Sequence, residues 1–179
     1  MTKTRHIALD FEIDKLTRSI ENTITGESCP TEILLATAED IAQIKEAKTW
    51  QFDWGKEYRT PKRKTYKLTT IADPQTIQGL MSMEIEQNYI RMHLIESANF
   101  NIGKGKVFMG VLGNLVAFAC KAAFDRKFNG AVAFYAKTKL IEHYKNALGA
   151  VHVGGHLMVL EGHASLSLVN KYFNQTSNA

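Results

Sequence analysis

The sequence predicts an α/β (α+β) protein built on a mixed, mostly antiparallel, twisted sheet that is flanked by helices. Three observations predict this class. Strand-like runs fill residues 66–97, an uncharged helical stretch follows them, and the chain then alternates strand and helix from residue 130 onward. The first half therefore has the character of antiparallel hairpins, and the second half that of β-α-β units.

Composition places the chain among ordinary globular proteins. Its 179 residues are 45% hydrophobic and 22% charged, which suits one domain with a proper core. Two cysteines exclude a disulfide scaffold. The net charge of +4 is compatible with an anionic ligand, a phosphorylated cofactor or RNA. Residues 1–14 lack the uninterrupted apolar core of a signal peptide, so we expect a cytoplasmic protein.

The N-terminal part carries helical spacing. Apolar residues recur at this spacing from residue 9 to residue 20, which predicts an amphipathic helix over 10–23. We therefore expect a helical extension over residues 1–30, followed by a globular domain over 31–179. In that domain, residues 31–36 form a strand, and Thr37 caps a helix with Asp40 in a capping box. Alternating aromatic residues predict a short strand at 50–54.

Three strands follow a basic segment, residues 59–67, which we expect to be a solvated loop or an arm for an anionic partner. The first strand covers residues 66–71. The next two, 77–86 and 89–97, are joined across Gln87 and Asn88 and read as an antiparallel hairpin.

An uncharged run from Val107 to Cys120 is too short for a membrane-spanning helix, which needs about 20 apolar residues. It predicts instead a buried helix from Val111 to Lys127. The elements expected after it are a buried strand at 130–136, a helix at 138–147, a strand at 156–160 and a helix at 164–173.

Glycine pairs precede the uncharged helix at residues 103–106 and 110–114. A glycine turn that opens a helix is suited to bind phosphate, because the first backbone amides and the helix dipole both favour an anion. Neither pair fits a Walker A loop or a dinucleotide-binding fingerprint. The alternative is that Gly110 and Gly113 only permit close packing of the helix.

The order of these elements resembles the fold of the Gcn5-related N-acetyltransferases (the GNAT superfamily). The resemblance covers Thr31 to Leu160. Lys106 falls near the basic position of that family's pyrophosphate loop, and Gly110 falls at a loop glycine. An alternative register is centred on Gly103 and Gly105 and places Phe100 or Ile102 at the basic position. Tyr144 matches the tyrosine of the family's Tyr-x-x-x-Gly-Phe signature, although one extra residue precedes Gly149 and an alanine replaces the phenylalanine.

The resemblance implies transfer of an acetyl group from acetyl-CoA to an amine. It implies Tyr144 as general acid toward the coenzyme A thiolate and Glu96 as base, with an ordinary core tyrosine and a strand-end carboxylate as the alternatives. Backbone amides of the strand that carries Leu94, Ile95 and Glu96 would bind the pantetheine and the thioester oxygen. The cofactor-binding residues implied are Leu94, Ile95, Ser97, Lys106, Gly110, Val111, Leu112, Gly113 and Asn114.

Two other functions stay open at this point. One is a GNAT-like binding protein without catalytic activity, and the other is an RNA-associated module that uses residues 59–67. The histidines form no recognisable metal-ligand pattern, so we expect no metal. Homodimers are common in the resembled family. The sequence identifies neither a dimer interface nor the amine acceptor.

Overall fold

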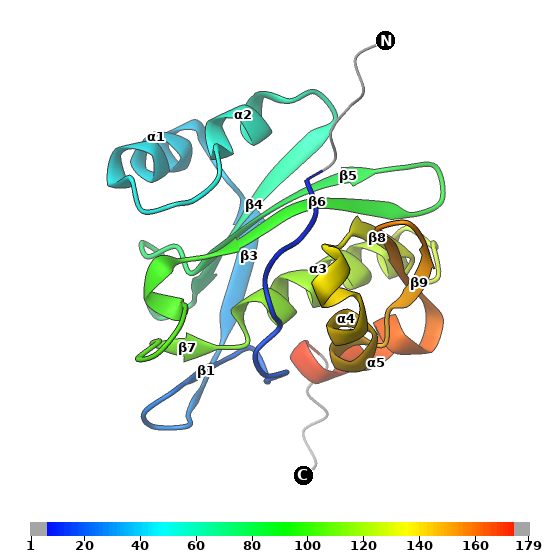
Figure 1. Ribbon diagram of the computed structural model, residues 1–179. Coiled ribbons are helices and arrows are strands. Elements are labelled where there is room, and N and C mark those ends of the chain that lie inside the picture. The colour runs from blue at the N-terminus through cyan, green and yellow to red at the C-terminus, as the bar shows by residue number, and fades with distance from the viewer. Residues whose placement is uncertain (1–6, 174–179) are drawn as a thin grey trace.

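A seven-stranded sheet forms the centre of the computed structural model, which describes residues 7–173 (Figure 1). In spatial order its strands are β3 (Thr31–Leu35), β4 (Arg63–Thr70), β5 (Gly79–Ile85), β6 (Ile90–Ser97), β8 (Val132–Tyr135), β10 (Leu157–Leu160) and β9 (Val151–Gly154). All neighbours pair antiparallel except β6 and β8, which are parallel. The predicted fold class is confirmed.

The protein has a second, smaller sheet of three strands. It contains β2 (Ser28–Cys29), β1 (Ile20–Asn22) and β7 (Phe108–Met109), in that order. Both of its pairings are antiparallel. Since β7 directly precedes the long helix, this small sheet ties residues 20–29 to the start of that helix.

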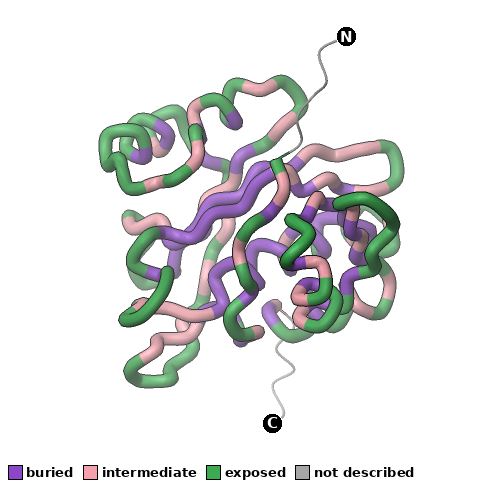
Figure 2. Tube along the Cα trace, viewed as in Figure 1, coloured by how far each residue is buried: buried purple, intermediate pink, exposed green. Residues whose placement is uncertain are grey.

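Helices cover the large sheet on both faces. They are α1 (Ala38–Ala47), α2 (Trp54–Arg59), α3 (Val111–Asp125), α4 (Ile141–Leu148) and α5 (Gly162–Tyr172), with single 3₁₀ turns at Asn99–Asn101 and Thr138–Leu140. Side chains alternate along a strand, so Leu94 joins the smaller core around Trp54, whereas Ile95 joins the larger core against α3. Figure 2 shows the buried residues concentrated in the central strands and α3.

Several elements agree with their local sequence signals. Thr37 and Asp40 form the reciprocal capping box of α1, with N–H to oxygen distances of 2.8 and 3.1 Å. The β5–β6 hairpin pairs Ile85 with Ile90, as its turn predicts. The uncharged run forms α3 and begins at Val111. Among residues 7–173, no helix combines the length and the apolar character needed to cross a membrane.

The predicted helix over 10–23 is wrong. Residues 7–19 contain no helix and run in an extended path, and β1 begins at Ile20. Their backbone groups bond to distant parts of the chain, as Leu9 does with Tyr135 and Lys137. The helical extension therefore does not exist in the described residues. The division into residues 1–30 and 31–179 stays a prediction, and residues 1–6 lie outside the description.

Two further expectations need correction. Residues 50–53 form no strand, because Asp53 caps the helix α2 through its side chain, which accepts from the Lys56 N–H at 3.0 Å. Much of the basic segment is not a loop, since β4 begins at Arg63. The edge strand β9 was not predicted at all.

Candidate functional site

The parallel strands β6 and β8 separate soon after they begin. Their ladder covers two positions, Ile90 with Val132 and Arg91 with Ala133, although β6 continues to Ser97. Such a separation leaves backbone groups on the facing edges of both strands without a partner in the sheet. It also creates a groove that leads toward the start of α3.

Residues 9–17, which we call the N-terminal strap, run from the end of β8 past α4 to the start of α3 and so occupy this groove; Figure 1 shows their extended path in front of the sheet. The Leu9 N–H donates to the Tyr135 carbonyl at 2.8 Å, and the Lys137 N–H donates to the Leu9 carbonyl at 3.0 Å. Leu9 thereby forms an isolated parallel bridge with Ala136. The strap uses the edge of β8 that β6 has left.

Tyr144 on α4 reaches the middle of the strap. Its side chain is 1% exposed, and its hydroxyl donates to the Phe11 carbonyl at 2.5 Å. The neighbouring His143 accepts from the Ile13 N–H through Nε2 at 2.8 Å. Burial raises the pKa of the Tyr144 hydroxyl well above its usual value, and the charges of the nearby carboxylates add to the rise. Tyr144 therefore keeps its proton at neutral pH.

The start of α3 meets the other end of the strap. Gly110 is the N-cap and has no side chain to accept from the first turn of the helix. Its own N–H donates to Asp14, at 3.1 Å to Oδ1. Asp14 also pairs with Lys106, whose Nζ lies 3.0 Å from Oδ2. A carboxylate at this place is stabilised by the positive end of the helix dipole.

The glycines of this region allow very close contacts. A Cβ on Gly110, whose φ is 86°, would lie 1.9 Å from Thr17 Oγ1, and a Cβ on Gly113 would lie 2.1 Å from the Tyr172 hydroxyl. That hydroxyl in turn accepts from the Thr17 N–H at 3.3 Å. Both glycines thus serve the close packing that the sequence left open as an alternative, and the packing partners are the strap and α5.

A cavity of about 360 Å³ lies beside the strap. It is lined by Asp10, Phe11, Glu12, Asp14, Ser97, Asn101, Ile102, Gly103, Lys106, Val111 and Leu112. The Ser97 hydroxyl is buried and has no hydrogen-bond partner among the described residues. Three acidic residues of the strap border the same space. Lys139 and Lys137 lower the pKa of one of them, Asp10, which therefore carries its charge.

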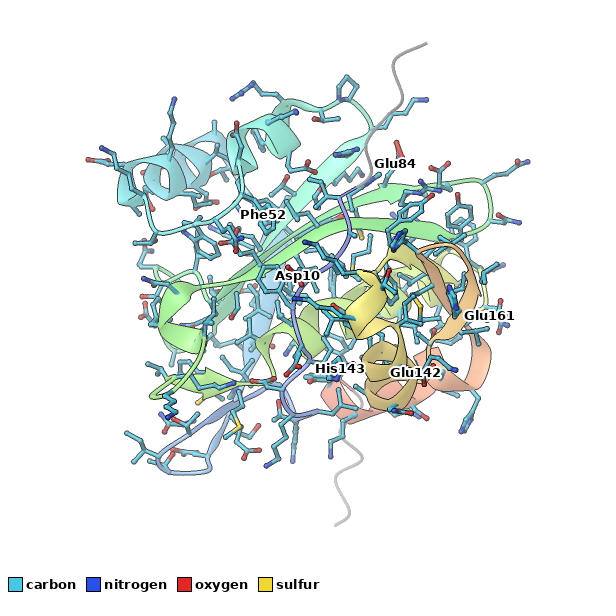
Figure 3. The ribbon with its side chains drawn as sticks, in the orientation of Figure 1. Asp10, Phe52, Glu84, Glu142, His143 and Glu161 are labelled. Carbon is cyan, nitrogen blue, oxygen red and sulfur yellow. The ribbon has the colours of Figure 1, made fainter. Side chains whose placement is uncertain are left out.

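Glu96 lies on the opposite face of β6 from Ser97. Its carboxylate accepts three hydrogen bonds, from the Gln51 N–H at 2.6 Å, the Phe52 N–H at 3.1 Å and Trp54 Nε1 at 2.9 Å. These bonds fix the loop before α2. The ring of Phe52 then meets the ring of Phe11 edge to face, with centroids 5.9 Å apart. In the view of Figure 3, Asp10 on the strap lies between Phe52 and His143.

The remaining predicted positions have other partners. Asn114 points its amide at Thr31, with Nδ2 3.0 Å from Oγ1, and so joins α3 to β3. Leu94 and Ile95 pair with Ser82 and Met81 of β5. Of the predicted residues, Ser97, Lys106, the start of α3 and Tyr144 border the groove, whereas the carboxylate of Glu96 does not. Within residues 7–173, no three metal-binding side chains gather at one point.

Sequence reasoning missed the residues that fill this groove, above all Phe11 and Asp14. Residues 9–14 read Leu-Asp-Phe-Glu-Ile-Asp, a strict alternation of apolar and acidic side chains. This pattern is typical of an extended segment with one buried face. The wider spacing of residues 9–20 obscured it, because Leu9, Ile13, Leu16 and Ile20 also fit a helical face.

No protein-family model and no curated protein matches this chain. Solved structures do. The spermidine N-acetyltransferase from Vibrio cholerae, in complex with CoA and spermine, is 12% identical with a TM-score of 0.52, over 76% of this chain and 98% of that one. Mutant forms of the spermidine/spermine N-acetyltransferase SpeG of that organism are 12% identical with a TM-score of 0.54, over 76% and 96%. A dodecameric form is 13% identical with a TM-score of 0.50, over 82% and 98%. The chain therefore has the GNAT fold, as the sequence led us to expect.

Proposed function

We propose that this protein is an N-acetyltransferase that moves an acetyl group from acetyl-CoA to an amine. One observation carries the proposal: the hydroxyl of Tyr144 and the start of α3 meet the same groove between β6 and β8. The GNAT fold supports it, as does the CoA complex of one structural neighbour. We leave the acceptor as an amine of unknown identity.

The groove residues suit coenzyme A once the strap has left. A diphosphate would bind at the first amides of α3, at Val111 and Leu112, with Lys106 and the partnerless hydroxyl of Ser97 beside it. Backbone groups of β6 near Leu94 and Ile95 would orient the pantetheine. When bound, acetyl-CoA supplies an activated thioester carbonyl. In the described arrangement, residues 9–17 occupy two of the groups that it would need, the Gly110 N–H and the Tyr144 hydroxyl.

Tyr144 is the proposed general acid. Its burial favours the protonated form, so the hydroxyl can donate a proton to a departing thiolate. In the present arrangement the same hydroxyl donates to the Phe11 carbonyl. A donor that already points into the groove needs little rearrangement to act on a different acceptor.

We assign Glu96 a positioning role. Three N–H donors on its carboxylate support this role, because they leave it committed to residues 51–54. The amine would then lose its proton to water as it attacks. The base role expected from the resemblance stays an alternative that a pH profile of Glu96→Gln can test.

A second candidate is a GNAT-like binding protein without catalysis, which the filled groove favours. The RNA-associated function has less support, because Arg63 and Lys67 pair with Glu57 and Asp40 inside the fold. Self-association belongs to our proposal, since one structural neighbour is dodecameric. A cytoplasmic location also stays a proposal.

Thiol release from acetyl-CoA tests the enzyme, with a panel of primary amines as acceptors. We expect Tyr144→Phe to lower kcat by about 100-fold or more, because it removes the proton donor. Tyr66→Phe is the matched control, since Tyr66 packs against Phe118 at 5.0 Å between centroids, away from the groove. Equal turnover by both variants would make Tyr144 structural. Binding of CoA without turnover would favour the second candidate.

A further inference from the structure

We propose that the groove between β6 and β8 is also a peptide-binding site, and that residues 9–17 are its built-in ligand. In this view the strap and acyl-CoA are mutually exclusive occupants, so the strap holds the protein in an inactive state. The inference rests on the proposed function. The occupant is this segment of the chain itself, and it would compete with acyl-CoA for the groove.

The strap matches the groove along its length. Leu9 and Ile13 are 2% and 4% exposed and belong to the large core, while Asp10, Glu12 and Asp14 are exposed and border the cavity. An extended segment that buries alternate residues and pairs with a strand edge is bound as peptide ligands are bound by β-augmentation. The segment therefore has the features of a ligand for this groove.

The strap engages the groups that acyl-CoA needs. The Asp14 carboxylate accepts a hydrogen bond from the Gly110 N–H and pairs with Lys106, at the place where a diphosphate would bind. The Phe11 carbonyl accepts the hydrogen bond of the Tyr144 hydroxyl, at the place where the thiolate would leave. Phe11 also meets Phe52, on the loop that Glu96 fixes, so one strap residue occupies the expected reaction centre.

The two occupants would need the same groups, the Gly110 N–H and the Tyr144 hydroxyl, although a cavity of about 360 Å³ lies beside the strap. The strap packs so tightly on α3 that even a methyl group on Gly110 would overlap Thr17. Its carboxylates would also repel a diphosphate, since Asp10, Glu12 and Asp14 border the same cavity. Acyl-CoA can therefore bind only after the strap leaves, and its apparent affinity falls by the fraction of molecules in which the groove is open.

The strap can leave without unfolding the sheet. It is joined to β8 by an isolated bridge at Leu9, to the Gly110 N–H through the Asp14 carboxylate, and to side chains of α4 and α5. The seven strands of the large sheet pair with one another in an order that does not include the strap. Local opening of the strap exposes Leu9 and Ile13 but keeps these strand pairings, so it costs less than global unfolding.

The first test compares Asp14→Ala with Asp125→Ala in the full chain, by calorimetric titration with CoA. Loss of the charged hydrogen bond to Gly110 and of the Lys106 pair should tighten CoA binding by about tenfold or more. Asp125, the last residue of α3, pairs with Lys121 at 3.2 Å and borders neither the strap nor the cavity, so Asp125→Ala should bind as the wild type does. Hydrogen exchange of residues 9–17 should rise when CoA is added to the wild type.

The second test locks the strap. Leu9 and Ala136 lie opposite each other in the bridge, and paired strand positions about 5 Å apart suit a disulfide. The double variant Leu9→Cys/Ala136→Cys should lose CoA binding when oxidised and regain it when reduced. Wild type taken through the same treatment controls for Cys29 and Cys120, which are free thiols.

The outcomes separate the two proposals. If the oxidised and reduced lock bind CoA equally, or if CoA leaves the strap's exchange unchanged or slower, the peptide-site inference is overturned and the enzyme proposal stands. If neither Asp14→Ala nor the reduced lock binds CoA or acetyl-CoA, while both stay folded by circular dichroism, the enzyme proposal fails and the competition falls with it.

Discussion

The β5–β6 hairpin and the N-terminal strap are both extended, yet they are held in opposite ways. The hairpin strands pair with each other across a short turn, from Ile85 with Ile90 to Gly79 with Ser97. The strap bonds to groups 96 to 155 positions away along the chain, at Gly110, His143, Tyr144 and Tyr172. Contacts between residues so far apart in the chain cost more conformational entropy to form than the contacts of a hairpin. The strap contacts can therefore open while the hairpin stays paired.

The largest expected effect compares the core of the sheet with the strap. Phe134→Ala should lower the free energy of unfolding by about 3–5 kcal/mol, because Phe134 on β8 is fully buried. Ile13→Ala should cost only about 1–2 kcal/mol, although Ile13 is also buried, because the strap can leave before the sheet unfolds. Urea denaturation measures both.

Ile24→Ala is the control, since Ile24 is 93% exposed and should change nothing. Hydrogen exchange adds a second view: Ile13→Ala should speed the exchange of residues 9–17 and leave β5 and β6 protected. A loss for Ile13→Ala as large as that for Phe134→Ala would show that the strap and the sheet unfold as one unit.

A smaller effect should come from the contact of the strap with α3. Gly103→Ala and Gly110→Ala both place a side chain at positive φ, which costs about 1–2 kcal/mol. Gly103 has open space around it, whereas a Cβ on Gly110 meets Thr17 at 1.9 Å. We therefore expect Gly110→Ala to be about 1–3 kcal/mol more destabilising, by thermal denaturation.

The double variant Gly110→Ala/Thr17→Ala sharpens this comparison. Removal of the Thr17 hydroxyl takes away the closest clash, so the two substitutions should be non-additive and part of the loss should return. Strict additivity in the double-mutant cycle would show that Thr17 does not lie in close contact with residue 110 in solution.

The smallest effect concerns the locally determined region at the start of α1. Burial raises the pKa of Asp40, but the bonds from Thr37 and Lys67 outweigh it, so the pKa lies below its usual value. A lowered pKa stabilises the fold above the unfolded value of about 4, and this stability is lost as the pH falls through the folded value.

Asp40→Asn should therefore cost about 1 kcal/mol at pH 7, and the cost should vanish as the pH falls below about 4. Denaturation at several pH values measures it. Glu39→Gln is the control, because Glu39 is a neighbouring exposed carboxylate of the same first turn. If the stability lost in Asp40→Asn did not depend on pH, the charge of Asp40 would not be the source of the stabilisation.

The agreement between sequence and structure follows the range of the interactions. The capping box at Thr37 and Asp40, the hairpin turn at Asn88 and the C-cap at Gly149 each lie within a few residues of the element that they define. The strand predicted at residues 50–54 is wrong: besides the Asp53 cap of α2, Glu96, more than 40 positions away along the chain, binds the backbone of Gln51 and Phe52. The family resemblance also pointed to Tyr144, Lys106 and Gly110, which lie on α4 or just before α3, and their roles stay predictions.

By itself, the sequence determined the strand-rich first half, the start of α3 at Val111 and the helix that carries Tyr144. Periodicity and caps act over one or two turns and depend little on the rest of the chain. Only the tertiary structure decided the path of residues 9–17. Alternating apolar and acidic side chains suit any extended segment with one buried face. The surface that buries this face is formed by groups at the end of β8, at the start of α3 and on α4, and these come together only in the folded chain.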